Sequence, residues 1–380
     1  MKKNNTHINL IIITIIALVG LNIASCSKQS SETPKSIILI IADGGGIGHL
    51  SALRYFKDDF APARFDNIAL VTNYMQEPAK VTDSGAAGTA MSSGYKTFKN
   101  AIGVTRNEAG EVVPVKSVVE YAQEKGMATG LVTTSFINDA TPATFSVHYH
   151  KRKHRVQIAH LMADAGVDVL FGGGDKFFKK PWPKSSDTLT AYDKFRANDI
   201  QIITKLDDSI DPSQAVLGIF AEEQLPDTYD GREVTGRAMA AKALELIGDD
   251  PEGFFLLIEE EGVDNMSHDR DSVRVLAEMQ SVNDIINLAL DYQADHPDVL
   301  VIYGSDHDTG SMAVIDDEEK GGLKLIFATR EHTSNLIPLF STGPGSEAFQ
   351  GVIDNTFIGE SLIEFVTGEE YDTLNHLLDE

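Results

Sequence analysis

The stretch that decides the fold is SIILIIADGGGIG, residues 36–48. Its first part, residues 36–42, is almost wholly aliphatic, and an aspartate followed by glycines comes directly after it. A short apolar run bounded by turn residues is typical of a strand that is buried on both faces of a sheet. Because ligands of open α/β sheets bind beyond the carboxyl ends of the strands, Asp43 is a candidate site residue.

The glycines of residues 44–48 do not have the spacing of a dinucleotide-binding loop. The third glycine of G-x-G-x-x-G would fall at His49. We expect instead that the glycines bring the Asp43 carboxylate and the backbone close to a metal ion. A simple turn or helix cap is the alternative interpretation of the same residues.

Further aliphatic runs predict buried strands at residues 127–133, 167–171, 254–258 and 299–303. Patterns of helical length and spacing alternate with them at residues 115–125, 232–247 and 271–292. This alternation predicts an α/β fold in which a mostly parallel sheet is covered by helices on both faces. Residues 37–380 contain no internal linker or repeat, so they are predicted to form one domain.

Residues 1–36 predict export. Two lysines precede the apolar run 10–21, which has signal-peptide length and is short for a membrane span of about 20 residues. Residues 23–26, Ile-Ala-Ser-Cys, resemble a bacterial lipoprotein signal, in which residues 1–25 are removed and Cys26 is lipidated. Residues 26–36 would then be a tether. We expect a cell-envelope lipoprotein that faces the periplasm or the cell surface; an ordinary cleaved signal peptide is the alternative.

The net charge of the chain limits the classes of molecule that it is expected to bind. The formal net charge is −25, and it becomes −27 when residues 1–25 and their two lysines are removed, so no nucleic-acid partner is expected. An acidic protein that handles an anionic substrate needs local positive charge, which bound divalent cations and a well-placed arginine would supply. Cys26 is the only cysteine, which excludes an internal disulfide.

Two segments that follow predicted strands carry metal-ligand types. In EEEGVDNMSH, residues 259–268, Asp264 and His268 are four positions apart and would share one face of a helix. Four acids within six residues at the end of a buried strand indicate bound cations, because their repulsion and desolvation otherwise go uncompensated. A solvated acidic loop is the alternative.

The second segment, GSDHDTG, spans residues 304–310. Its Asp306 and His307 offer adjacent oxygen and nitrogen donors that suit zinc. His332 lies just before the aliphatic run 336–340 and is uninformative on its own.

The nucleophile candidate is Ser84 in VTDSGAAGTA, residues 81–90. It stands at the start of a predicted helix of small residues, where backbone N–H groups and the helix dipole favour a phosphate. A cap of that helix, formed by Asp83 or Ser84, is the alternative interpretation. The basic stretch at residues 151–155 could clamp a phosphate, and arginine suits bidentate binding better than lysine.

These segments, in this order and over essentially all of residues 36–380, resemble the alkaline phosphatase family. The resemblance implies a three-layer sandwich with a large, mostly parallel sheet. It also implies an exported phosphomonoesterase that uses two Zn2+ ions and one Mg2+ ion. Phosphate monoesters would be hydrolysed through a phosphoserine intermediate to an alcohol and inorganic phosphate.

The resemblance also implies a role for each site residue by position. Ser84 would be the nucleophile, and Arg152, eleven residues after Thr141, would bind phosphate, with Lys151 and Lys153 as bystanders. The implied ligands of one zinc are Asp264, His268 and His332, those of the other are Asp43, Asp306 and His307, and those of magnesium are Asp43, Thr141 and Glu259.

The chain departs from the family pattern in three places. Asp139 matches the bacterial type, but Asn265 follows the zinc aspartate where bacterial relatives often have lysine. Only 24 residues separate His307 from His332, so the crown insertion of many relatives is expected to be reduced or absent. The family resemblance also implies a possible homodimer, and a reduced crown weakens that expectation without ruling the homodimer out. The disulfides of some exported relatives are absent.

Three alternatives follow from the same residues. A sulfatase would need a C/S-x-P-x-R motif, which the residues after Ser84 do not form. A phosphodiesterase of the same superfamily would use the same two zinc ions, although such enzymes usually have threonine as nucleophile and lack the arginine. A phosphate-binding lipoprotein without catalysis is the third alternative, and the intact set of site residues argues against it.

Overall fold

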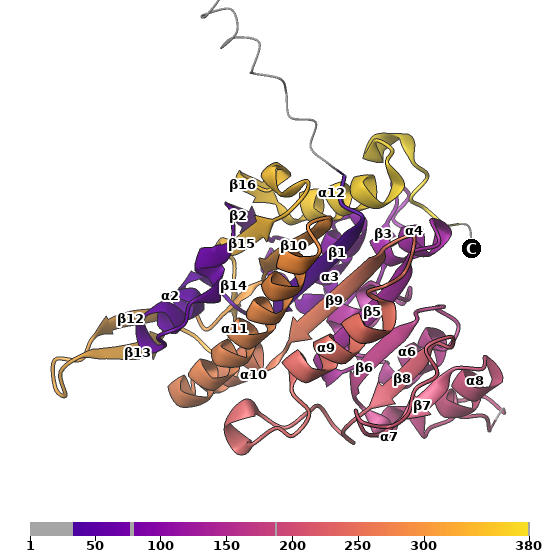
Figure 1. Cartoon of the computed structure of the whole chain (residues 1–380), viewed down its shortest axis with the longest axis horizontal. Helices are drawn as coiled ribbons and strands as arrows, with labels where there is room; N and C mark the ends of the chain where they lie inside the picture. The colour runs from indigo at the N-terminus through magenta and orange to yellow at the C-terminus, as the bar shows by residue number, and fades with distance from the viewer. Residues whose placement is uncertain (1–32, 77–79, 187, 379–380) are drawn as a thin grey trace, which may run out of the picture. The chain divides into compact units, whose positions relative to one another are not determined.

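The structure is a computed structural model that describes residues 33–76, 80–186 and 188–378 (Figure 1). The predicted signal peptide, Cys26 and most of the predicted tether lie outside the described residues. In the part of the chain that is described, no helix is both long and apolar enough to span a membrane.

A ten-stranded sheet forms the centre of the described domain, with the strand order β16-β2-β15-β10-β1-β9-β5-β6-β8-β7. All neighbouring strands pair in parallel except β15, which is antiparallel to both β10 and β2. The strands are β1 (Ser36–Ala42), β2 (Asn67–Thr72), β5 (Ala128–Phe136), β6 (Val169–Gly173), β7 (Gln201–Ile203), β8 (Val216–Ile219), β9 (Phe254–Glu260), β10 (Val299–Gly304), β15 (Ile337–Thr342) and β16 (Gly351–Asp354). The prediction of a mostly parallel sheet is confirmed.

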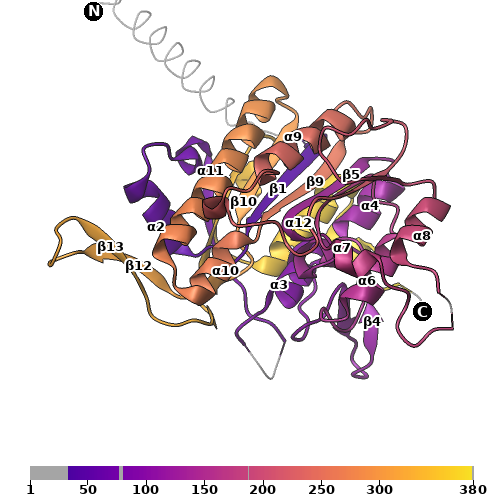
Figure 2. The ribbon, with the colours of Figure 1, turned by 90° about the horizontal axis from the view of Figure 1, so that it is seen from below.

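Helices cover both faces of the sheet, which gives the three layers that were expected (Figure 2). Strand β1 lies between β9 and β10 and contributes alternate side chains to two separate cores. Helices on one face are α3 (Ser84–Ser93), α4 (Val118–Glu124), α5 (Ala140–Thr144), α6 (Arg155–Met162), α8 (Ala191–Ala197) and α12 (Asn355–Thr367). Helices on the other face are α2 (Ile47–Phe56), α9 (Gly236–Ile247), α10 (Gly262–Asp269) and α11 (Ser272–Asp295).

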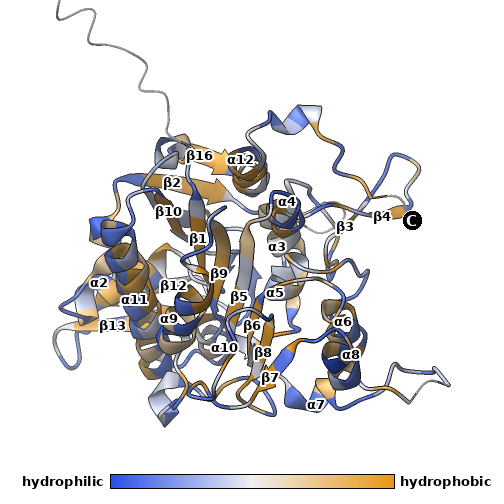
Figure 3. Cartoon of the chain, turned by 45° about the vertical axis from the view of Figure 1, so that its right-hand side comes forward, coloured by the Kyte–Doolittle hydropathy of each residue, from blue (hydrophilic) through white to orange (hydrophobic). Residues whose placement is uncertain are grey.

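The hydropathy of the chain follows this layering. In Figure 3 the hydrophobic colour is concentrated in strands such as β8 and β9, between the two helical layers. The side chains of β1 and β9 are buried along the whole length of both strands. Such two-sided burial explains why these strands read as continuous apolar runs rather than as alternating patterns.

Two predicted helices begin later than their patterns suggested, and capping gives the reason. Helix α4 begins at Val118 because the Ser117 and Glu120 side chains form a capping box with the first turn. Helix α9 begins at Gly236 because the Thr235 side chain accepts a hydrogen bond from Ala238 N. Residues 232–235 therefore lie outside the helix, which leaves Arg232 free to extend toward the sheet.

The segment between His307 and His332 is small. It contains the short strands β11 (Asp308–Thr309) and β14 (His332–Thr333), which pair with each other, and the hairpin of β12 (Met312–Asp316) and β13 (Leu323–Phe327). The hairpin extends away from the sheet (Figure 2). The pairing of β11 with β14 brings His332 back toward the strand end that carries His307.

Candidate active site

The candidate site lies at the carboxyl ends of the central strands β1, β9 and β10. Asp43 follows β1, Glu259 stands near the end of β9, and Asp306 and His307 follow β10. Their exposed fractions are all 1% or less. The three strands are neighbours in the sheet, so their carboxyl ends deliver these side chains to one place.

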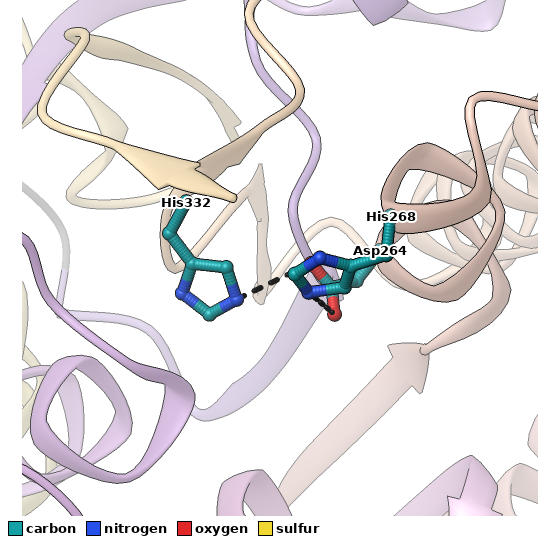
Figure 4. A group of neighbouring side chains, drawn as sticks. All are labelled: Asp264, His268 and His332. Carbon is teal, nitrogen blue, oxygen red and sulfur yellow. Dashed lines mark ion pairs between the residues drawn. The ribbon is translucent and has the colours of Figure 1, made fainter. Parts of the chain in front are cut away.

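Asp264, His268 and His332 form the first group of potential metal ligands (Figure 4). Helix α10 places Asp264 and His268 one turn apart, and His268 Nε2 lies 3.2 Å from Asp264 Oδ2. His332 enters from β14, with its Nε2 atom 3.6 Å from Asp264 Oδ1. The predicted sharing of one helix face is confirmed, and the structure adds the third side chain from a distant strand.

Asp43, Asp306 and His307 form the second group. His307 Nε2 lies 3.3 Å from Asp43 Oδ1 and 3.2 Å from Asp306 Oδ2. Gly44 has a φ of +71°, and its N–H donates to Asp306 Oδ1 at 3.1 Å. A Cβ at Gly44 would lie 2.8 Å from Asp264 Oδ1, so only glycine allows this close approach of the backbone to both carboxylates.

The three histidines share one orientation. The Nδ1 atom of His307 lies 3.2 Å from Thr309 Oγ1, and that of His332 lies 3.0 Å from the carbonyl oxygen of Thr82. His268 Nδ1 contacts the carbonyl oxygen of Arg330. With Nδ1 occupied in this way, each ring turns Nε2 toward the carboxylates, as metal-ligating histidines do.

The donor geometry of both groups fits zinc. Tetrahedral zinc with ligands at about 2.0–2.1 Å has donor atoms about 3.3–3.4 Å apart. The four histidine–carboxylate separations in the two groups are 3.2–3.6 Å, and all donors of a group lie within 4.8 Å of one another. Asp43 Oδ1 and Asp306 Oδ2 are buried and have no hydrogen-bond partner among the residues that the structure describes. A cation is the partner that such orphaned carboxylate oxygens need.

A third group is built only from oxygen donors. The carboxylate oxygens of Asp43, Glu259 and Glu261 lie within 4.8 Å of one another. Thr141, at the start of α5, lies close to the Glu259 carboxylate, yet its buried Oγ1 atom makes no hydrogen bond of normal geometry within the described part of the chain. The structure thus brings together the three predicted magnesium ligands and adds Glu261, which the sequence analysis did not single out.

Burial and mutual repulsion perturb these groups strongly. Burial raises the pKa of Glu259 to about 8 and that of Asp306 to about 7. Burial, together with the charge of Asp306, raises the pKa of Asp43 well above its usual range. The hydrogen bond with Asp264 raises the pKa of His268 to about 9. Bound cations would reverse the shifts of the carboxyl groups by stabilising their charged forms.

Ser84 is the first residue of α3, beside the second group. Its Oγ atom lies 3.3 Å from His307 Nε2, and the residue is 3% exposed. The cap of the helix is Asp83, whose side chain accepts a hydrogen bond from Ala86 N. The capping interpretation therefore holds for Asp83, whereas the Ser84 hydroxyl faces the potential metal ligands.

Arg152 reaches the same place from the loop before α6. Its guanidinium lies 3.4 Å from Asp83 Oδ2 and 3.2 Å from Asp139 Oδ1. Lys151 and Lys153 are exposed. Arg155, which the sequence analysis did not select, donates to both carboxylate oxygens of Asp139 at 2.9 and 2.8 Å. Two guanidinium groups thus converge beside Asp139, and Arg152 is the one that also contacts Asp83, the cap of α3.

Comparison with known proteins decides the family. A family model described as alkaline phosphatase matches residues 34–319. The chain belongs to the alkaline phosphatase family. The family prediction is confirmed, and the match supports the predicted enzyme class, a phosphatase that is a hydrolase.

The relatives agree with this assignment. The chain is 36% identical to alkaline phosphatase 3 of Bacillus subtilis (strain 168), in a match that covers 76% of this chain and 64% of that protein. It is 29% identical to alkaline phosphatase 4 of the same organism, with 88% of this chain and 89% of the relative covered. The chain thus spans less than two thirds of the first relative and most of the second.

The solved structures agree on the fold. The alkaline phosphatase of the Antarctic bacterium TAB5 superposes with a TM-score of 0.80 at 32% identity, covering 88% of this chain and 98% of that chain. The cold-active enzyme of Shewanella sp. gives a TM-score of 0.77 at 26% identity. The predicted α/β fold of alkaline phosphatases is confirmed.

The environment of Glu260 shows that one prediction about the acidic residues 259–264 of this alkaline phosphatase family member was wrong. The sequence predicts cations beside all four acids, but Glu260 belongs to none of the groups of potential metal ligands and pairs with Arg232 at 2.8 Å. Arg232 also contacts Glu278 at 3.0 Å, and all three side chains are at most 3% exposed. Ser281 and Thr134 donate further hydrogen bonds to Glu260. This network fixes the turn between Glu259 and Glu261.

We expect Arg232→Ala to lower the free energy of unfolding by about 3–5 kcal/mol, because it leaves two carboxylates buried without a counter-charge. Urea unfolding followed by circular dichroism, with metal concentrations held constant, measures the change. Arg274→Ala is the matched control, since Arg274 pairs with Asp227 and Asp230 at the surface and its loss should cost at most about 1 kcal/mol. Equal losses for both variants would contradict the prediction.

The raised pKa values predict how pH affects the chelated protein. Burial raises the pKa of Glu259 to about 8, so the native state keeps this proton up to about pH 8, whereas the unfolded chain releases it near the ordinary glutamate pKa of 4.5. The unfolded state therefore binds fewer protons in this window, and stability falls as pH rises. His268 acts in the same direction, because its stabilisation is complete below about pH 6.5 and is lost through about pH 9.

The expected result in EDTA is a melting temperature that drops by at least about 5 °C between pH 5 and pH 8. Zinc and magnesium should abolish most of this drop, because cations stabilise the ionised carboxylates. Differential scanning calorimetry of the chelated and metal-loaded protein measures both. A chelated protein that becomes more stable over this range would refute the prediction.

Proposed function

We propose that this chain is an exported phosphomonoesterase that uses Ser84 to hydrolyse phosphate monoesters to an alcohol and inorganic phosphate. The observation that carries the proposal is the placement of a helix-terminal hydroxyl 3.3 Å from the Nε2 atom of a potential zinc ligand. Two groups of nitrogen and oxygen donors and a guanidinium surround that hydroxyl. The proposed nucleophile, the proposed metal ligands and the arginine proposed to bind phosphate thus lie together.

The proposed metals are two zinc ions and one magnesium ion. Zinc would be held by the first and second groups, and magnesium by the oxygen-only third group with Thr141. A solved structure of a TAB5 alkaline phosphatase variant has Mg bound in its M3 site, which supports magnesium as a family cofactor. When bound, such cations act as Lewis acids that favour the ionised hydroxyl and neutralise phosphoryl oxygens.

Ser84 performs the covalent step. The Ser84 hydroxyl loses its proton to solvent as its Oγ atom attacks phosphorus. The bond from phosphorus to the alcohol oxygen breaks, and that oxygen takes up a proton from solvent as the alcohol leaves. A phosphoserine remains on Ser84. Attack by water on the same phosphorus then breaks the bond to Oγ, which releases inorganic phosphate and restores the hydroxyl.

Arg152 and helix α3 balance the charge of the phosphoryl group. Two guanidinium N–H groups of Arg152 can hold two oxygens of that group, and Asp83 and Asp139 position the guanidinium from behind. The N-terminal end of α3, a helix of ten residues, adds the favourable end of its dipole at Ser84. The folded protein already holds these groups in place, so no free energy is spent on orienting them during the reaction.

His307 is not assigned the role of general base. Its Nε2 atom faces Ser84, but it also faces Asp43 and Asp306 at 3.3 and 3.2 Å, as a metal ligand would. Its other nitrogen lies near Thr309 Oγ1. A nitrogen that holds a cation could not also accept a proton, so His307 would serve as a ligand and not as the base.

The test compares the hydrolysis of p-nitrophenyl phosphate with that of bis(p-nitrophenyl) phosphate by the protein after chelation and after metals are restored. We expect monoester turnover at alkaline pH that chelation abolishes and that zinc plus magnesium restores. Diester turnover exceeding monoester turnover would overturn the proposal in favour of a phosphodiesterase. Phosphate binding without turnover of either ester would favour a non-catalytic binding protein.

We propose in addition that the chain is anchored to the bacterial cell envelope by lipid on Cys26, facing the periplasm or the cell surface. The support is the sequence of residues 23–26 and the absence of any other cysteine. Metabolic labelling with a radioactive fatty acid should label the wild-type chain and leave Cys26→Ser unlabelled. Equal labelling of both would refute the anchor.

A further inference from the structure

Glu261 occupies a position that the proposed ligand sets do not explain. It is the residue between the end of β9 and the start of α10, yet its side chain makes no capping hydrogen bond. Its carboxylate instead joins those of Asp43 and Glu259, with ligand oxygens within 4.8 Å of one another. Within residues 33–76, 80–186 and 188–378, no hydrogen bond or ion pair satisfies the Glu261 carboxylate.

The surroundings of Glu261 disfavour this orientation unless a cation is present. Asp43, Glu259, Asp139 and Asp264 all act on it as like charges. Arg152 is the favourable charge nearby, but it already contacts Asp83 and Asp139. A partly buried glutamate with free torsions would turn toward water to escape such repulsion.

Thr141 gives an independent indication of a ligand at the same place. It is 1% exposed, and its hydroxyl oxygen makes no hydrogen bond of normal geometry among the described residues, although it lies close to the Glu259 carboxylate, which belongs to the same group as Glu261. Leaving a buried hydroxyl unsatisfied costs about 1–3 kcal/mol. A bound cation would satisfy this oxygen together with the carboxylates.

We propose that Glu261 is a direct ligand of the third cation, which makes that site a three-carboxylate site for a hard divalent ion such as Mg2+ or Mn2+. This inference rests on the proposed metal-dependent function. All the donors are oxygens, which hard cations prefer, whereas the histidine-containing groups suit zinc. Ligand charge count tunes the affinity of such sites, so the extra carboxylate gives tighter binding than Asp43, Thr141 and Glu259 alone.

The experiment measures metal binding rather than turnover. The whole protein is stripped with a chelator, loaded with two equivalents of zinc, and titrated with Mn2+ while electron paramagnetic resonance reports the free ion. We expect one tight Mn2+ site in the wild type and at least about tenfold weaker binding in Glu261→Gln. Glu261→Asp, which keeps the charge on a shorter side chain, should fall between the two.

Glu252→Gln is the matched control. It removes the same charge from an exposed residue beyond the opposite end of β9, so its Mn2+ affinity should equal that of the wild type. Zinc content and melting temperature of every variant show whether the zinc groups and the fold remain intact. A comparable loss of affinity in Glu252→Gln would attribute the effect to overall charge and overturn the inference.

The outcomes separate this inference from the proposed function. If Glu261→Gln binds Mn2+ as tightly as the wild type, Glu261 is not a ligand, while the proposed function stands as long as the wild type hydrolyses monoesters. A wild type that binds zinc and Mn2+ but hydrolyses no ester contradicts the proposed function and leaves the ligand assignment standing. A wild type without any third-metal binding overturns the inference.

Discussion

Ser84→Ala is expected to lower kcat for p-nitrophenyl phosphate by about 10³-fold or more while leaving zinc content unchanged. The Ser84 hydroxyl is the only group assigned to form a covalent bond with phosphorus. It lies beside, and not within, the two groups of nitrogen and oxygen donors. Its removal should therefore abolish chemistry without emptying the metal sites. Steady-state kinetics with metal analysis of the same samples measures both.

Ser93→Ala is the control for that variant. Ser93 lies at the other end of α3, is fully buried, and donates to the carbonyl oxygen of Thr89 at 2.7 Å. Its loss should cost about 1 kcal/mol of stability and little activity. The nucleophile assignment would be wrong if Ser84→Ala retained activity within tenfold of the wild type in metal-replete buffer.

Asp43→Asn is expected to cause the second large loss, about 10²-fold or more in kcat/KM, accompanied by a loss of bound metal. Asp43 belongs to both the second and the third ligand group, so one substitution weakens two sites. The chelated variant should nevertheless be at least as stable as the chelated wild type. Burial and the neighbouring carboxylates make a charge at Asp43 unfavourable in the absence of cations.

The measurements are metal content, monoester kinetics and melting temperature, each with and without chelator. Asp298→Asn provides the control, because Asp298 is exposed at the start of β10, at the opposite end of the sheet. An Asp43→Asn protein that binds the full complement of metals and keeps its activity would show that the shared carboxylate is dispensable.

Much of the fold could be predicted from sequence because the central strands are buried on both faces. Strand β1 matches its aliphatic run residue for residue, and β9 and β10 extend theirs by one or two residues. Their carboxyl ends meet at one edge of the sheet, so the acids and histidines that follow them could be expected to converge. The peripheral strands β2 and β16 were missed, since neither is buried on both faces.

The positions of side chains that depend on partners far away in the sequence could not be predicted from the local sequence around them. His332 has no local signal, and its position depends on the pairing of β11 with β14. Glu260 and Glu261 are adjacent acids, yet one pairs with Arg232 and the other turns toward Asp43 and Glu259. Because side chains alternate between the two faces of a strand, these neighbouring acids could have been assigned to opposite faces. The sequence does not show which face holds Arg232. Arg155 was passed over because nothing local distinguishes it from Arg152.

The most direct test of the account is to trap the covalent intermediate. Metal-loaded protein is mixed with excess monoester or inorganic phosphate, quenched in acid, digested and examined by mass spectrometry. The account predicts a phosphoryl adduct on the peptide that contains Ser84, present in the wild type and absent from Ser84→Ala. Active protein that yields no adduct under any quench condition, or an adduct on another residue, would contradict it.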